Sequence, residues 1–131
     1  MASTDKKVGY LPEGKRPDYT PVTAALGVEE ALQFLEGRWK MTILFHLFGD
    51  RLMRFSDLER AIPAISQKML IQQLRKLESD GIVRRIVHHQ VPPKVEYGLT
   101  KWGEKLCPAL DALLLWAEDQ SAPSETNESD V

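Results

Sequence analysis

Hydrophobic residues recur every three or four positions along much of the chain, a spacing typical of amphipathic helices. The first run of this kind ends at Gly37, the second at Gly49-Asp50 and the third before Pro63. Because glycine and proline commonly end helices, the pattern predicts three helices in this half of the chain. Ser56 is expected to cap the third of them.

A fourth helix is predicted to begin at Ser66 and to end at Asp80-Gly81. Its buried face is formed by three leucines, Leu70, Leu74 and Leu77. The hydrophobic period then changes from about 3.6 to 2 on both sides of Pro92-Pro93, which predicts a β-hairpin with proline at its tip. Thr100 is expected to cap one long last helix that runs to Ala117.

This order of elements predicts a mostly α fold with a small β-hairpin wing (α+β). Two short helices joined by a tight turn at residues 62–65, with a hairpin soon after, are the layout of a winged helix-turn-helix. Polar, proline-bearing residues 1–24 are expected to form a flexible arm, residues 25–120 the domain, and residues 121–131 a disordered acidic tail.

The net charge of −2 conceals an uneven distribution. Residues 38–105 contain thirteen Lys and Arg against seven Asp and Glu, whereas residues 118–131 contain five acidic residues and no basic one. A basic middle segment suits a surface that contacts nucleic-acid phosphates, because affinity depends on the charge near the contact. The alternative is a basic patch that has arisen by chance.

The polar side of the predicted fourth helix carries residue types that read DNA. Glutamine pairs with adenine edges, and lysine or arginine with guanine edges or phosphate. Ser66 and the amides of the first turn suit a phosphate oxygen. The alternative is the ordinary solvated face of an amphipathic helix. The residues on this side are Gln67, Lys68, Ile71, Gln72 and Arg75.

The predicted wing carries a second group of basic and polar side chains. They are His88, His89, Gln90 and Lys94 near the tip, with Arg84 and Arg85 lower down and Glu96 as the acidic exception. Adjacent residues on a strand point to opposite faces, so His88 and His89 would need a third ligand to share a metal ion. No metal site is therefore expected.

The last predicted helix is apolar on most of its circumference, because residues 113–116 read Leu-Leu-Leu-Trp. A chain of this size has little core in which to bury them, so we expect a homodimer. The alternative is packing against the chain's own core. The expected interface residues are Leu32, Leu35, Leu110, Leu113, Leu114 and Trp116. The three tryptophans are expected in the core, with a small-molecule effector pocket at the interface as the alternative.

Several classes of function receive no support from the sequence. No Ser/His/Asp set, phosphate-binding loop or zinc motif is visible, so neither an enzyme nor a cofactor is expected. The single cysteine, Cys107, excludes an internal disulfide and is expected to be a small buried apolar residue. No apolar run reaches the roughly 18 residues of a membrane span, and the first residues do not resemble a secretory signal. A cytoplasmic protein without membrane contact is expected.

Several segments resemble the HxlR-type family of transcription regulators. The matching segments are Arg38-Trp39-Lys40, residues 54–58, the turn and helix start at residues 62–70, residues 74–83, and residues 91–100. The resemblance spans residues 26–117 and implies a dimeric, MarR-like winged-helix fold that binds double-stranded DNA and activates or represses transcription. The terminal helices would form the dimer.

The resemblance also implies roles for individual residues. The side chains facing the groove would be Ser66, Gln67, Lys68, Gln72 and Arg75, with Arg54 near phosphate and Lys94, beside His89, on the wing. The chain departs from the family at three places, of which the first is a long arm before Leu26 that could reach DNA or the partner chain. Leu26-Gly27 replaces the usual Cys-Pro, so the usual sensing thiol is missing. His88-His89-Gln90 changes the charge of the wing tip and favours a pH-sensitive phosphate contact.

Two other classes of function stay open at this point. A winged helix can serve as a protein-interaction module whose acidic tail repels DNA, and a dimer interface can hold the ligand of a small enzyme or carrier. DNA binding after deletion of residues 121–131 separates the first class from a regulator, and a co-purified ligand would indicate the second. The sequence does not predict the operator, the direction of regulation or the inducing signal.

Overall fold

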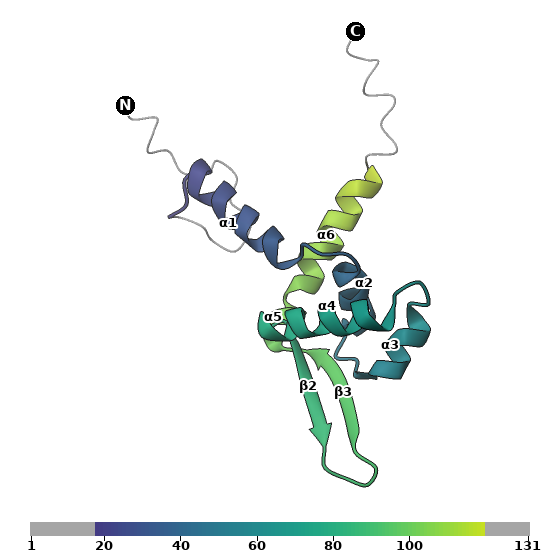
Figure 1. The fold of residues 1–131 in the computed structure, drawn as a ribbon. Coiled ribbons are helices and arrows are strands. Elements are labelled where there is room, and N and C mark those ends of the chain that lie inside the picture. The colour runs from purple at the N-terminus through teal and green to yellow at the C-terminus, as the bar shows by residue number, and fades with distance from the viewer. Residues whose placement is uncertain (1–17, 120–131) are drawn as a thin grey trace, which may run out of the picture. The chain divides into compact units, whose positions relative to one another are not determined.

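The computed structural model describes residues 18–119. Residues 1–17 of the predicted arm and the whole predicted tail, residues 121–131, lie outside this part. The elements are, in chain order, α1 (Pro21–Phe34), α2 (Lys40–Leu47), β1 (Met53–Arg54), α3 (Phe55–Ala61), α4 (Gln67–Ser79), β2 (Val83–His88), β3 (Lys94–Leu99), α5 (Lys101–Glu104) and α6 (Leu106–Asp119). Figure 1 shows them as a ribbon. The predicted mostly α fold with a hairpin wing is confirmed.

The chain divides into two compact units, residues 1–37 and 38–131. In the first unit, Thr20 caps α1: the Thr23 N–H donates to Thr20 Oγ1 (3.2 Å), and the Thr20 N–H donates to Thr23 Oγ1 (2.9 Å). Pro21 fits the first helical position, where a missing N–H costs nothing. The helix therefore begins four residues inside the range predicted as an arm. None of the α1 residues, all described, is buried.

The core of the second unit lies where α2, α3 and α4 meet the sheet. Its most deeply buried side chains come from all three helices and from the start of β2, and they are Ile43, Leu44, Leu47, Leu58, Leu70, Leu74, Leu77, Ile82 and Val83. The three leucines predicted to form the buried face of α4 are among them. Burying side chains of this size stabilises a fold by roughly 1.5–3 kcal/mol each.

The residue predicted to cap α4 does so in the structure, whereas the residue predicted to cap α3 does not. Ser66 caps α4 as predicted, with its Oγ accepting the Met69 N–H at 3.0 Å. Ser56, the predicted cap of α3, instead lies inside that helix. The carboxylate of Asp57 satisfies the helix start, because Asp57 Oδ2 accepts the Arg54 N–H at 2.9 Å. The side chain that hydrogen-bonds the backbone at the start of α3 is thus that of Asp57, whereas Ser56 was expected in this role.

Three antiparallel strands form the sheet in the order β1-β3-β2. The predicted hairpin is β2 and β3, called the wing below, and its strands pair from Val83 with Leu99 to His88 with Lys94. Sequence analysis missed β1, because two residues are too few to show alternation. β1 places Arg54 opposite Glu96 of β3.

The predicted last helix is two helices, α5 and α6, which break at Lys105. Thr100 caps the first of them, as its Oγ1 accepts the Gly103 N–H at 2.9 Å. Pro108 explains the break, because proline has no N–H and its ring would clash with the carbonyl of Glu104 four residues earlier. In residues 18–119, none of the helices has the length and apolar character needed to cross a bilayer.

Candidate nucleic-acid interface

The polar face of α4 is exposed along the whole helix. Gln67, Lys68, Gln72 and Arg75 are all exposed, opposite the buried leucines. They lie one or two turns apart, so the side chains form a stripe on one side of the helix. Ser66 at the start of this stripe is exposed as well, with its Oγ engaged by the Met69 N–H. A polar stripe of this kind has the donors and acceptors needed to contact base edges.

The strand register separates the basic residues of the sheet onto two faces. Residues directly opposite each other on antiparallel strands point to the same side. Arg54, Glu96 and Ile86 are therefore on one face, together with the His88–Lys94 pair. The same pairing places Arg85 and Tyr97 on the other face.

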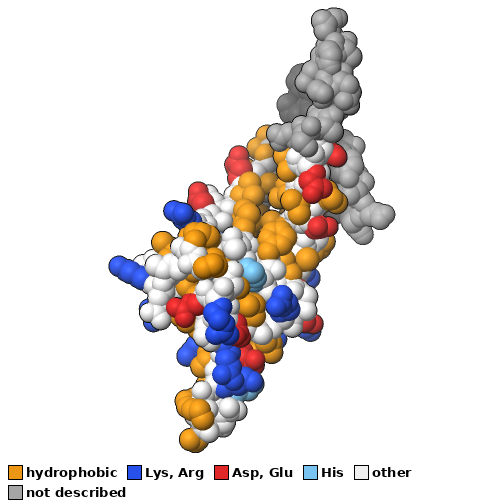
Figure 2. All heavy atoms as spheres, turned by 90° about the vertical axis from the view of Figure 1, so that its right-hand side faces the viewer, with side chains coloured by type: hydrophobic (Ala, Val, Ile, Leu, Met, Phe, Trp, Pro, Cys, Tyr) orange, Lys and Arg blue, Asp and Glu red, His pale blue; other side chains and the backbone are white. Residues whose placement is uncertain are grey.

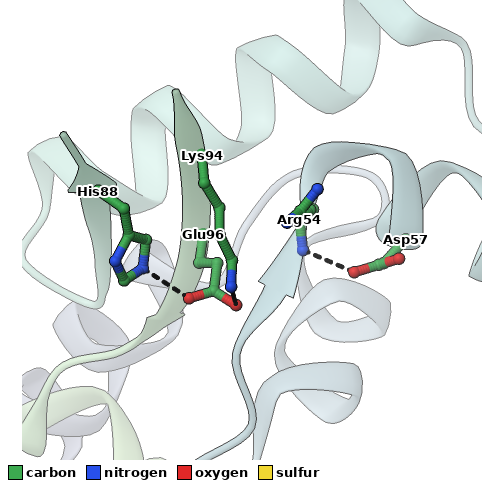
Figure 3. Close-up of polar contacts among 5 residues, drawn as sticks. All are labelled: Arg54, Asp57, His88, Lys94 and Glu96. Carbon is green, nitrogen blue, oxygen red and sulfur yellow. Dashed lines mark hydrogen bonds and ion pairs between the residues drawn. The ribbon is translucent and has the colours of Figure 1, made fainter. Parts of the chain in front are cut away.

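The first face holds a compact ionic group around Glu96, shown in Figure 3. His88 Nε2 lies 2.8 Å from Glu96 Oε1, within hydrogen-bond distance, and Lys94 Nζ lies 3.7 Å from Glu96 Oε2. Arg54, on the neighbouring strand, is exposed. Two predicted DNA contacts, Arg54 and Lys94, are thus brought together. We call His88, Lys94, Glu96 and Arg54 the wing cluster.

The wing cluster keeps Glu96 ionised. The hydrogen bond from His88 lowers the pKa of Glu96 below its ordinary value of 4.5, and the positive charges of Lys94, His88 and Arg54 lower it further. Partial burial of the carboxylate acts in the opposite direction and is outweighed. At neutral pH the cluster therefore holds one negative charge among two permanent positive charges.

The histidine that joins the cluster is His88, whereas the sequence selected His89. His89 lies just past β2 and is exposed. Alternation alone places the two histidines on opposite faces, but only the register shows which face carries Glu96. Sequence analysis therefore missed the partnership of His88 with Glu96.

A cavity of about 410 Å³ lies between α4 and the other face of the sheet. Its lining residues include Ile71, Arg75 and Glu78 from α4 and Arg85 and Tyr97 from the wing. Arg75, a predicted groove residue, thus shares a recess with Arg85, a wing residue that was not among the predicted DNA contacts. The recess has two cations against one carboxylate and can accept an anionic group.

Basic side chains gather on the side of the molecule seen in Figure 2. Lys and Arg (blue) form a band over its lower half and along the wing, whereas the wing tip at the bottom is hydrophobic. Val91 at this tip is 98% exposed. The band, together with the α4 stripe, provides a cationic surface with polar hydrogen-bonding groups.

The residues expected at a dimer interface fall into two groups. Leu32, Leu113, Leu114 and Trp116 are exposed hydrophobic side chains, and Trp116 is 71% exposed. Leu35 and Leu110 are instead only 6% and 4% exposed. These two leucines differ from the expectation, because a side chain already buried in its own chain has little surface left for a second copy.

The other residues considered from the sequence are the tryptophans, Cys107 and His46. Trp102 and Trp116 are exposed rather than in the core, and Cys107 is half-buried rather than buried. His46 lines a shallow recess of about 330 Å³ with Met41, Thr42 and Phe45 of α2. Within residues 18–119, no three His, Cys, Asp or Glu side chains are grouped so that they could hold a metal ion.

The chain is similar in sequence to helix-turn-helix transcriptional regulators. Residues 34–125 match the family model described as HxlR-like helix-turn-helix. The HTH-type transcriptional regulator YtcD of Bacillus subtilis is 50% identical over 91 residues, which cover 70% of this chain and 71% of YtcD.

Two solved structures are also similar. Redox regulator HypR in its reduced form has 44% identity and a TM-score of 0.67, covering 76% of this chain and 98% of that one. A MarR-family regulator from Enterococcus faecalis V583 has 28% identity and a TM-score of 0.70, covering 95% of this chain and 100% of that one.

Proposed function

Because the chain belongs to the HxlR-like family of helix-turn-helix transcriptional regulators, we propose that it binds specific sites on double-stranded DNA as a homodimer. One α4 helix enters the major groove of each half-site. The observation that carries this proposal is the exposed stripe Gln67, Lys68, Gln72 and Arg75, set opposite a fully buried leucine face. A helix anchored in this way presents the polar stripe to a groove without losing core contacts.

The sheet supplies the contacts to the DNA backbone in this proposal. Arg54 and Lys94 carry permanent positive charge on one face of the sheet, and Ser66 lies at the start of α4. Phosphate contacts of this kind fix the orientation of the protein on the duplex, whereas the α4 side chains select the sequence.

The homodimer rests on the exposed apolar side chains of the two terminal helices. Leu32 of α1 and Leu113, Leu114 and Trp116 of α6 expose large hydrophobic surfaces that water disfavours. A two-fold dimer buries the same surface on both copies, and it presents its two α4 helices to sites about 34 Å apart. The operator is therefore a pseudo-palindrome.

The switch in this proposal does not use the sensing thiol that the family resemblance implies at position 26, which lies inside α1. One similar solved chain is named a redox regulator, but this chain has Leu26 at that position, and its single cysteine is Cys107 in α6. We propose a small-molecule effector at the dimer interface instead.

Substitutions on α4 should change the base preference of the protein, whereas substitutions on the wing should change its affinity for all DNA sequences. This difference tests the proposal. Gln72→Ala or Arg75→Ala removes a base contact, so discrimination against altered operators falls by roughly 1–3 kcal/mol per lost contact. Lys94→Ala removes a phosphate contact, so it weakens binding to all sequences alike and lowers the salt slope by about 1 per site. Fluorescence anisotropy with the DNA upstream of the protein's own gene, and with mutated versions of it, measures both.

A matched control lies next to Gln72. Gln73 is half-buried and donates its Nε2 hydrogen bond to Met69 Sδ at 3.2 Å, away from the exposed stripe. Gln73→Ala should leave base preference unchanged. If Gln72→Ala and Arg75→Ala behave like this control, α4 is not the reading helix.

A further inference from the structure

Glu96 uses both of its carboxylate oxygens to contact basic side chains of the wing. Oε1 is 2.8 Å from His88 Nε2, and Oε2 is 3.7 Å from Lys94 Nζ. The two basic side chains are cross-strand neighbours, and Arg54 lies opposite Glu96 on the third strand (Figure 3). A carboxylate thus occupies the centre of a surface whose other charged groups suit DNA phosphate.

We propose that Glu96 is a positioning residue that competes with DNA phosphate for Lys94, and that protonation of His88 releases Lys94 to the phosphate. This inference rests on the proposed DNA-binding function. While His88 is neutral, the charge of the Glu96 carboxylate is balanced by Lys94 and Arg54. Once His88 is protonated, its hydrogen bond to Glu96 becomes an ion pair and neutralises the carboxylate.

The distances from His88 and from Lys94 to Glu96 indicate which of the two basic side chains leaves the carboxylate. At 2.8 Å the His88 contact is a hydrogen bond, whereas at 3.7 Å the Lys94 contact is a looser ion pair. An ammonium group at the end of a flexible stem has no fixed direction and can turn toward another anion. DNA phosphate is such an anion, so Lys94 is the group that moves and His88 is the group that stays.

The other charged groups near His88 come from the same face of the sheet and from the elements packed against it. Arg54 and Lys94 belong to the wing cluster, and Arg84 on the same face donates its Nε–H to the Leu99 carbonyl at 3.0 Å. Asp57 of α3 is engaged by the Arg54 N–H and by the Arg60 guanidinium. Arg85 and Glu78 line the cavity on the opposite face of the sheet.

The direction of the pH effect follows from these charges. The lowered pKa of Glu96 keeps the carboxylate ionised well below neutral pH. Histidine side chains ordinarily change charge between pH 5 and 8. Protonation of His88 therefore raises the net charge of the wing cluster from +1 to +2. DNA affinity increases in the same direction.

The test measures affinity for the same duplex between pH 8 and pH 6 at constant ionic strength, using the full chain. Wild type should bind about two- to fivefold more tightly at pH 6, the size expected of a partly exposed ion pair. Glu96→Gln should bind more tightly than wild type at pH 8 by a similar factor, because Lys94 is already free. His88→Gln keeps an amide donor that cannot be protonated, so its affinity should not depend on pH.

His46→Gln is the matched control, because His46 is a histidine of α2, outside the wing cluster and the α4 stripe. It should keep the wild-type pH response, and Lys94→Gln should lose it. A pH response that survives in His88→Gln overturns the proposal. Survival in Lys94→Gln also overturns it, since His88 would then contact DNA by itself. If wild type binds DNA at pH 8 but its affinity does not change with pH, this inference is wrong and the proposed function stands. If wild type binds no duplex at any pH, the proposed function is wrong as well.

Discussion

Gly103 of α5 is the residue at which a single methyl group should do most damage to the fold. A Cβ at this position would meet the backbone carbonyl oxygen of Ile82. The contact matters because the same region is tied together by Thr100, whose Oγ1 donates to the Gly81 carbonyl at 2.7 Å. The close approach of α5 to the start of β2 therefore requires glycine.

Gly103→Ala should lower the free energy of unfolding by about 1–3 kcal/mol, the usual cost of overpacking against a group that cannot move aside. Chemical denaturation measures this loss. Gly27→Ala is the control, because a Cβ there meets nothing within 4 Å and alanine favours a helix. Equal stability of wild type and Gly103→Ala would show that the α5 contact is looser than described.

At the scale of elements, the wing cluster joins all three strands of the sheet. Glu96 lies on the central strand, β3, and contacts His88 on β2, while Arg54 lies opposite it on β1. The interactions that lower the pKa of Glu96 favour its ionised form in the folded state over the unfolded state. The cluster therefore links the stability of the sheet to pH.

Lowering the pH should destabilise the wild-type protein through protonation of Glu96. Glu96→Gln has no carboxylate at this position and cannot lose stability in this way. Because the folded pKa of Glu96 is below its ordinary value of 4.5, the stabilisation is fully present above that value and is lost as the pH falls through the folded pKa. The stability advantage of wild type over Glu96→Gln should thus shrink as the pH falls from 6 to 3 in denaturation experiments. A constant difference over this range would contradict the assignment.

The elements also differ in how well the sequence predicts them. α4 could be predicted in full because its cap Ser66, its leucine spacing and its Asp80-Gly81 end all agree. The wing could be predicted as a hairpin, but not its register, because alternation does not show which residues of two strands lie opposite each other. The Glu96 contacts depend on that register. Pro108 is the sequence signal for the break between α5 and α6, because proline cannot continue the helix at that point.

At the scale of the molecule, the candidate DNA surface and the exposed apolar helices lie on different elements. Gln67 to Arg75 are on α4 and the basic cluster is on the sheet, whereas Leu113, Leu114 and Trp116 are on α6. The sequence could indicate that α6 has too many apolar residues for one buried face. It could not show that Leu110 is the one that packs within the chain, because burial depends on the break between α5 and α6.

The measurement that tests the central proposal most directly is selection of bound duplexes from a random DNA library by the full-length protein. A homodimer with α4 in the major groove should enrich an inverted repeat whose half-site centres are about one helical turn apart, roughly 34 Å. Trp116→Glu, which places a charge in the proposed interface, should enrich only single half-sites. Enrichment of no sequence, or of the same unrepeated sequence by both proteins, would contradict the account.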